Sequence, residues 1–298
     1  MKFGKVEHPE LIDFSIPQDH PDTEVLFAKY KEEDQPLKVN VGCAKWNRQD
    51  LKNFYPRGTK DELAYYSSQF NCIELNATFY RIFPAKTYEG WYEKTPDNFK
   101  FFPKIVQNVS HLRRLNEQAY PILEEYLNLT ANLKEKLGTM FLQMHNNFSP
   151  KDWDRVVRFV ENWPKEFSLA MEFRHTDWFN DEKVAQELYH LLEENTIANI
   201  LVDTAGRRDI MHMRLTNNEA FIRYVGANHE SDYSRLDDWV EKLYDWKQKG
   251  LKNIHFFVHQ NLELESPLLS VYFIQKLNER LNLDLKIPET LIKPNTLF

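Results

Sequence analysis

The chain has 298 residues and a formal charge of −7, which gives no general electrostatic reason to bind polyanions such as nucleic acids. Hydrophobic residues make up 42% of the sequence and charged residues 28%, which excludes a disordered chain and supplies enough apolar side chains for a large core. Only 8 glycines occur, and none lies in a GxGxxG, GxxxxGK[ST] or GxSxG motif, so glycine-dependent nucleotide loops and the nucleophile elbow are excluded.

Short runs of β-branched or aromatic residues recur along the chain and predict strands. Most of these runs are followed by a segment with helical periodicity. The eight runs are LKVNVG from Leu37, CIELNATF from Cys72, KFFPKIV from Lys100, GTMFLQMH from Gly138, FSLAMEFRH from Phe167, ANILVD from Ala198, AFIRYVG from Ala220 and NIHFFVH from Asn253.

The predicted helices rest on apolar period and on residues typical of helix ends. Thr59 and Glu62 have the spacing of a capping box for a helix over residues 59–70. Further helices are expected to start at Ser149, Ser234 and Ser266, where a hydroxyl is available as a cap. The residues after the sixth run show no convincing amphipathic pattern, so the sixth helix is expected to be abbreviated.

This alternation predicts an α/β fold, a (β/α)8 TIM barrel. The chain from Leu37 to Leu285 has about 250 residues, the size of such a barrel. An open, doubly wound sheet is the alternative, but that fold usually has a glycine-rich first turn, which this sequence lacks. We predict one barrel domain over residues 37–298, including a C-terminal tail, and an N-terminal extension over residues 1–36.

Cysteine usage and the apolar pattern predict a cytoplasmic protein with no membrane association. Cys43 and Cys72 are too far apart for a CxxC pair and too few for a disulfide scaffold. The first residues lack the apolar core of a signal peptide, and no apolar run is long enough to cross a bilayer.

Polar residues that end the strand runs are the candidate site residues, because the carboxyl ends of barrel strands form the active face. Period-two alternation places Glu74 and Asn76 inward together, and likewise Glu172 and Arg174. Other runs end in polar side chains that we assign to the same face: Lys104, Gln143, His145, Asp203, Arg223 and His259.

Two interpretations of these inward charges stay open. Glu74 and Glu172 could form a structural ion network with Lys104, Arg174 and Arg223, because a buried charge is costly unless it is paired. Alternatively, a carboxylate with a tuned pKa transfers protons while the cations hold the substrate.

Aromatic side chains are expected at the rim of the same face. Trp46 follows the first run, Tyr80 the second and Trp178 the fifth. Their ring faces suit stacking on sugars or bases, and Trp46 and Tyr80 are the preferred candidates.

Several blocks resemble the YecE-like family, known as domain of unknown function 72: VGCAKWNRQDLKNFYPRG, ELAYYSSQFNCIELNATFYR, TPDNFKFFPKIVQNVSHLRRL, LAMEFRHTDWF and FIRYVG. The resemblance runs from about Val41 to the final strand and leaves out the amino-terminal extension. Members of the family are TIM-barrel proteins without an established reaction, so the resemblance implies a fold and a shared site but no activity. The family's motif residues include Glu74, Asn76, Lys104, Glu172, Arg174 and Arg223.

Our first hypothesis is a metal-free enzyme that acts on a small anionic or sugar-like molecule by acid/base chemistry. Glu74 or Glu172 would be the general acid or base, with Lys104 as electrophile or second acid. Arg174 and Arg223 would hold a carboxylate or phosphate. The further substrate-binding candidates are Trp46, Asn76, Tyr80, Gln143, Trp178 and His259.

Two alternatives are a nucleic-acid or nucleotide-binding barrel without catalysis and a divalent-metal isomerase or hydrolase. The first would use Lys104, His111, Arg113 and Arg114 on phosphates, against an unfavourable net charge. The second would use oxygen and imidazole ligands. We favour neither, and we expect no cofactor and no metal, because basic residues on the same face would compete with a cation. The candidate metal ligands are Glu74, His145, Glu172, Asp203 and His259.

Overall fold

The predicted runs form short parallel strands in an α/β structure. The computed structural model describes residues 4–31, 35–51 and 53–291. Within these residues each run contains a strand, and the run from Ala198 is divided at Ile200 into two. The strands are β1 (Lys38–Cys43), β2 (Cys72–Leu75), β3 (Lys100–Pro103), β4 (Met140–Gln143), β5 (Leu169–Glu172), β6 (Ala198–Asn199), β7 (Leu201–Thr204), β8 (Glu219–Gly226) and β9 (Asn253–Gln260).

The strands pair in three parallel sheets, with the orders β1-β9-β8-β7, β2-β3 and β4-β5-β6. The register places Gln143 beside Glu172 and Arg223 beside Phe257. Backbone hydrogen bonds also link neighbouring sheets. Ile105 N donates to Phe141 O between the ends of β3 and β4 (2.9 Å).

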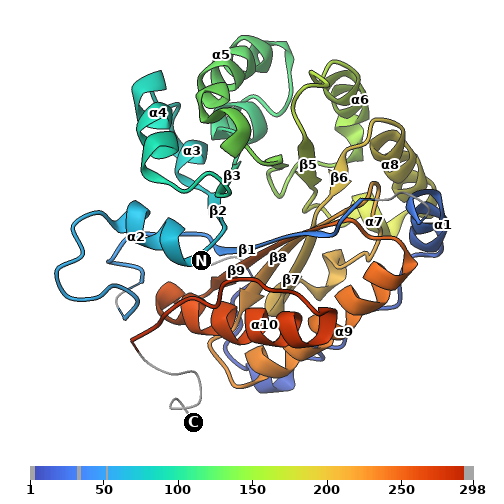
Figure 1. Cartoon of the computed structure of the whole chain (residues 1–298). Coiled ribbons are helices and arrows are strands. Elements are labelled where there is room, and N and C mark those ends of the chain that lie inside the picture. The colour runs from blue at the N-terminus through green and yellow to red at the C-terminus, as the bar shows by residue number, and fades with distance from the viewer. Residues whose placement is uncertain (1–3, 32–34, 52, 292–298) are drawn as a thin grey trace.

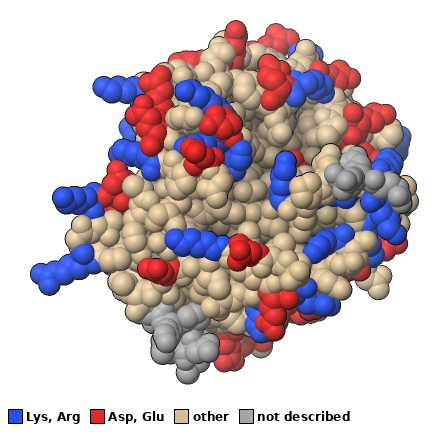
Figure 2. Space-filling model, viewed as in Figure 1, with Lys and Arg blue, Asp and Glu red and all other residues tan. Residues whose placement is uncertain are grey.

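The helices lie outside the strands. In Figure 1, α4, α5, α6 and α8 follow one another around one side of the strands, while α9 and α10 cover β8 and β9. Acidic and basic side chains are interspersed over this view of the surface (Figure 2). The helices are α1 (Pro21–Tyr30), α2 (Glu62–Gln69), α3 (Ala77–Tyr80), α4 (Ala85–Lys94), α5 (Tyr120–Thr130), α6 (Trp153–Glu161), α7 (Asp177–Asn180), α8 (Glu182–Glu194), α9 (Ser231–Lys249) and α10 (Ser266–Leu281).

Several element ends differ from the sequence prediction. The predicted capping box is wrong, because Asp61 caps α2 by accepting from Ala64 N (3.0 Å), while Glu62 pairs with Arg48. The second predicted strand was too long, because β2 ends at Leu75 and the next residues turn into α3. No α-helix occurs between β7 and β8, a stretch that is described throughout; the 3-10 helix η6 (Ala205–Ile210) takes its place. No helix in the described part of the chain is long and apolar enough to span a bilayer.

An apolar layer fills the space between the strands. It is built from alternate residues of nearly every strand, because successive side chains in a strand point to opposite faces. Its members include Cys72, Phe102, Phe141, Ala170, Ala198, Val202, Phe221 and Phe257. Two larger apolar clusters lie between the strands and the surrounding helices.

The amino-terminal segment packs along the strands and helices that follow it. Leu26 and Phe27 of α1 are buried in the core. Asp19 accepts a hydrogen bond from the indole of Trp246 in α9 (2.9 Å). Nearer the N-terminus, the ring of Phe14 lies against the guanidinium of Arg235 at 4.3 Å.

Candidate functional site

A layer of polar side chains lies directly beyond the apolar layer, at the carboxyl ends of the strands. Each of its members follows an apolar-layer residue by two positions, so both point to the same side of the strand. The members are Glu74, Lys104, Gln143, Glu172, Arg223 and His259, all of them buried.

Arg223 is the centre of an ion network in this layer. It donates to both oxygens of Glu74, at 2.9 and 2.8 Å, and to Glu172 Oε2 at 2.5 Å. The other oxygen of Glu172 accepts from Arg174 Nε. The charges therefore alternate along a buried chain, Glu74, Arg223, Glu172 and Arg174. This matches the structural-network interpretation except that, among the described residues, Lys104 forms no ion pair with these carboxylates within 4.0 Å.

Both carboxylates of the network are held in the ionised form. Burial opposes ionisation of Glu172, but the charges of Arg174 and Arg223 outweigh burial and lower its pKa to about 2. Burial likewise opposes ionisation of Glu74, whose pKa is nevertheless well below its usual range because Arg223 and His259 lie against it. Neither carboxyl group is thus available as a proton donor near neutral pH.

Two further side chains hold Glu74. Asn76, which stands before α3 rather than in the strand, donates to Glu74 Oε1 (2.7 Å). His259 lies 2.9 Å from Glu74 Oε2. Burial disfavours the imidazolium, but the neighbouring Glu74 carboxylate outweighs burial and raises the pKa of His259. Glu263 approaches the other ring nitrogen at 3.7 Å.

The amine of Lys104 contacts an amide, whereas the guanidinium groups of Arg174 and Arg223 contact carboxylates. Its Nζ donates to Gln143 Oε1 (2.7 Å) and lies 4.2 Å from the centre of the Phe79 ring. Burial, reinforced by the positive charges of Arg223 and Arg174, lowers the pKa of Lys104 to about 7. At neutral pH the amine is therefore present in both its charged and its neutral form.

A cavity of about 600 Å³ opens above this layer. Its size lies within the range of small-molecule sites. Eight of the predicted site residues line it: Trp46, Glu74, Asn76, Tyr80, Lys104, Gln143, Arg174 and His259.

Three of the predicted residues do not line the cavity. Glu172 and Arg223 belong to the ion network and contact the lining residues Arg174 and Glu74. Trp178 lies elsewhere. Its indole donates to Phe148 O (2.7 Å) and its rings pack in the apolar cluster around α6 and α8, so it has no exposed face for stacking on a ligand.

Other lining residues were missed by the sequence analysis. Lys45, Asn47 and Asp50 lie on the loop after β1, and Glu263 follows β9. Lys45 and Asn47 both bind the Asp50 carboxylate, at 3.0 and 2.6 Å. Inspection of the whole loop after each predicted strand, instead of strand ends alone, would have found these residues.

Asp203 was assigned to the wrong face. Its neighbour Val202 belongs to the inner apolar layer, so Asp203 points outward to the helices. There it accepts from Arg235 and from the indole of Trp239, both at 2.8 Å. His145 is partly buried and accepts from Asn147 N (3.1 Å). No cluster of three or more His, Cys, Asp or Glu side chains suited to a metal occurs among the described residues.

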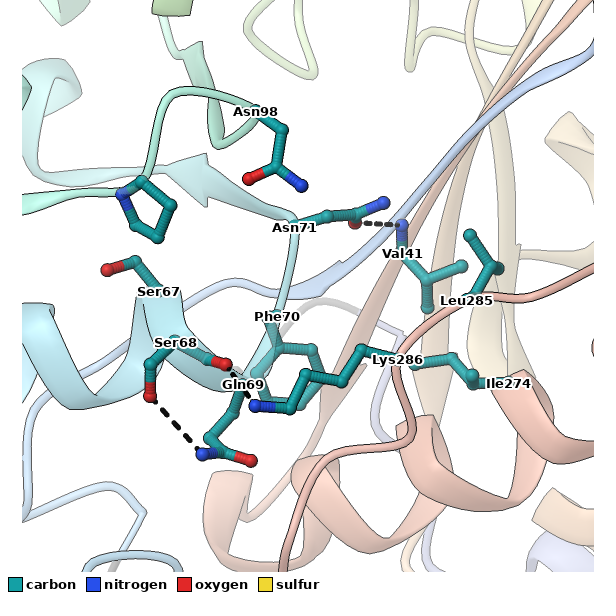
Figure 3. A pocket seen from close by; sticks show the side chains of 11 residues that line it. Val41, Ser67, Ser68, Gln69, Phe70, Asn71, Asn98, Ile274, Leu285 and Lys286 are labelled. Carbon is teal, nitrogen blue, oxygen red and sulfur yellow. Dashed lines mark hydrogen bonds between the residues drawn. The ribbon is translucent and has the colours of Figure 1, made fainter.

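A smaller cavity, of about 120 Å³, lies near the amino-terminal ends of β2 and β3 (Figure 3). Asn71 bridges to β1 there by accepting from Val41 N (3.1 Å). Lys286 of the C-terminal tail donates to Ser68 O (2.6 Å) across the mouth of this cavity. The Lys286 contact, together with the bond from Glu289 N to Gln69 Oε1 (3.0 Å), holds the tail against α2.

Parallel strands, a covering of helices and a cavity lined by buried charges at the strand carboxyl ends define an α/β protein, with its cavity where ligand sites of that class usually lie. The chain belongs to the family described as protein of unknown function DUF72, whose model matches residues 40–291.

Relatives support this assignment. The UPF0759 protein YecE of Escherichia coli K12 is 27% identical over 253 residues, covering 78% of this chain and 89% of the relative. The UPF0759 protein YunF of Bacillus subtilis is 27% identical over 232 residues, covering 72% and 81%. A DUF72 family protein from Enterococcus faecalis V583 has a similar fold, with a TM-score of 0.67 at 17% identity, covering 84% of this chain and 100% of that one. Another from Thermotoga maritima gives 0.60 at 22% identity, covering 81% and 99%.

Proposed function

We propose that this chain is an enzyme that acts on a small anionic or sugar-like molecule by acid/base chemistry in the 600 Å³ cavity. The observation that carries the proposal is the environment of Lys104. Its amine reaches the cavity, has a pKa of about 7 and pairs with an amide instead of a carboxylate. A group with a pKa near the ambient pH is suited to both giving and taking a proton.

The remaining roles follow from position. Arg174 lines the cavity and is the group that would hold a carboxylate or phosphate of the substrate. Glu74 also lines the cavity, but Arg223 and His259 hold its pKa well below the usual range, so its role is to orient its partners and proton transfer is left to Lys104. Glu172 acts through Arg174 and is a positioning residue. Trp46 and Tyr80 offer ring faces at the rim, where Tyr80 is 69% exposed.

Metal is not needed in this proposal. Both oxygens of Glu74 already accept hydrogen bonds from Arg223, and Lys104 and Arg174 line the same cavity, so a cation would meet positive charge. Nucleic acid is also not favoured, because Arg113 and Arg114 do not line the cavity and acidic side chains are interspersed with basic ones over the view in Figure 2.

We further propose that the three sheets close into a (β/α)8 barrel. Backbone hydrogen bonds such as Ile105 N to Phe141 O connect β3 to β4. β6 and β7 are separated by one residue, so the chain itself joins their two sheets. The side chain of Asn71 spans from β2 to Val39 and Val41 of β1. These links support closure around the apolar layer.

The proposed binding can be tested by thermal denaturation with sugars, sugar phosphates, nucleotides and organic acids. A ligand at a hundred times its dissociation constant stabilises the folded state by about 2.7 kcal/mol, which gives a measurable rise in Tm. We expect anionic compounds to raise the Tm of the wild type and of a Lys100→Met control, whose lysine contacts Glu135 outside the cavity. Arg174→Met should reduce that rise. An unchanged rise in Arg174→Met, or no rise with any compound, would refute the proposal.

A further inference from the structure

Lys104 differs from another buried lysine of the chain in what its amine contacts. Lys136 donates to two backbone oxygens, Tyr92 O at 2.7 Å and Thr95 O at 2.6 Å, which suits an ammonium with several protons to share. Among the described residues, the amine of Lys104 donates to Gln143 Oε1. No carboxylate lies within 4.0 Å of its Nζ among the described residues. A neutral amine that donates one hydrogen bond and keeps its lone pair fits this environment.

Three hydrogen bonds fix the backbone of Lys104, and the bond from Nζ to Gln143 Oε1 orients its amine. Lys104 N donates to Leu75 O (3.1 Å). Its carbonyl oxygen accepts from Thr78 Oγ1 at 2.8 Å and from Tyr126 Oη at 3.0 Å. Lys104 is 8% exposed and is one of the residues that line the cavity. A molecule bound in the cavity would therefore lie next to this lysine.

We propose that Lys104 is a covalent nucleophile, which forms an imine with the aldehyde or ketone carbonyl of a substrate that also carries an anionic group. This inference rests on the proposed function of the cavity and names its substrate class. The anionic group would be held by Arg174, which lines the same cavity. Lysine amines desolvated next to other cationic groups serve in this way in enzymes that act on carbonyl compounds.

The step balances without an oxidant or a reductant. The Nζ lone pair bonds to the carbonyl carbon, the carbonyl π pair moves to oxygen, and that oxygen takes a proton from the nitrogen. A second proton, taken from solvent, then converts the hydroxyl into water, which leaves as the nitrogen lone pair forms the C=N bond. The iminium carries one positive charge, as the ammonium would; Glu172 and Glu74 favour that charge, Arg223 and Arg174 oppose it, and the anionic group of the substrate helps to offset it.

Charged groups from several strands act on this amine. Arg223 of β8 and Arg174 after β5 disfavour the ammonium, while Glu172 of β5 and Glu74 of β2 favour it. His111, beside Phe79, has its own pKa lowered to about 4 by burial and by Lys104, so it is neutral near pH 7. With the Lys104 pKa at about 7, about half of the amine is neutral at that pH, against fewer than about one in a thousand for an ordinary surface lysine.

The test is reductive trapping on the full chain at pH 7. The protein is incubated with pyruvate, with glyceraldehyde 3-phosphate or with acetone, each with sodium cyanoborohydride, and the labelled lysines are identified by peptide mass spectrometry. We expect labelling of Lys104 by the two anionic carbonyl compounds at least about tenfold faster than labelling of Lys183, an exposed lysine of α8, because a larger fraction of the Lys104 amine is neutral. Acetone should label Lys104 more slowly than either.

Two variants complete the experiment. Lys104→Arg should abolish the dominant label, and Arg174→Met should slow labelling by the anionic probes more than labelling by acetone. Labelling spread over surface lysines without preference for Lys104, or none at all, would overturn the inference. If these anionic compounds still raise the Tm through Arg174, only the imine step has failed; if they do not bind either, the proposed function has failed with it.

Discussion

Replacing Arg223 by methionine tests whether the buried ion network stabilises the fold. The substitution removes three hydrogen bonds, two to Glu74 and one to Glu172, from a side chain that is 2% exposed. Both carboxylates would then keep a smaller set of partners. Glu74 retains His259 and Asn76, and Glu172 retains Arg174.

Breaking a buried ion pair by removing one partner costs about 3–5 kcal/mol, because the remaining charge loses its compensation. Since each carboxylate keeps another donor, we expect a loss near the lower end, about 3 kcal/mol. Urea denaturation followed by fluorescence measures this difference. The matched control is Arg280→Met, because Arg280 also makes three hydrogen bonds to a carboxylate, that of Glu241, but on the exposed surface. Its loss should be much smaller.

The pH dependence gives an independent check. The pKa of Glu172 falls from its ordinary 4.5 to about 2 on folding, so its ionised form contributes stability above pH 4.5, and this contribution is lost as the pH falls toward 2. The Arg223→Met variant should lose less stability over this range than the wild type does. A loss below about 1 kcal/mol at neutral pH, equal to that of an exposed pair, would refute the reasoning.

Two other predictions concern the cavity and the packing of β1. The pKa of Lys104 is about 7 in the folded chain and 10.5 in the unfolded chain, so the unfolded state binds more protons between these pH values. The unfolding free energy of the wild type, measured relative to that of Lys104→Met, should therefore rise from pH 7 to pH 10. A flat difference would contradict the buried amine. A Cβ on Gly42 would lie 2.3 Å from Cys72 O, so Gly42→Ala should cost about 1–3 kcal/mol, while Gly90→Ala in α4, with open space around the Cβ, should stabilise by about 0.5–1 kcal/mol. Equal effects in thermal melts would show that the approach of β1 to β2 is not tight.

The positions of the strands were predictable from the sequence because each is a short apolar run bounded by turn residues. The exact residues at which the strands end were not predictable. The backbone turns into α3 directly after Leu75, where the sequence CIELNATF reads as one continuous strand. The capping box failed because Asp61, two residues after Thr59, caps the helix by accepting from Ala64 N, so the helix begins at Glu62.

The inward polar residues were predictable where the strand parity was clear. Glu74, Lys104 and Arg174 come together at the cavity as alternation indicates. Alternation did not decide the side of Asp203, because Ala198, Ile200 and Val202 form one apolar set while the opposite set also contains the apolar Leu201, and only the neighbouring strands fix which set points inward. Nor could sequence separate Trp178 from the rim aromatics, since its burial depends on how α6 and α8 pack around it.

The sequence also did not predict which cation contacts which carboxylate. Alternation places Lys104 among four charged side chains without saying which carboxylate it meets. In the folded chain Arg223 takes both carboxylates, which leaves Lys104 with Gln143. Which cation contacts which carboxylate depends on distances between side chains of different strands, which the sequence does not give. This pairing changes the interpretation of Lys104 from a member of the ion network to the reactive amine.

The contacts of the amino-terminal segment bear on how this protein should be produced for study. A recombinant fragment trimmed to the region shared with the family, residues 40–291, would lack Asp19, Leu26 and Phe27. The indole of Trp246 would lose its acceptor and the apolar side of α9 would meet solvent, a surface prone to aggregation. Poor yield of such a fragment would therefore reflect the loss of the amino-terminal segment that packs on α9. Experiments on the cavity are best done with residues 4–31 present.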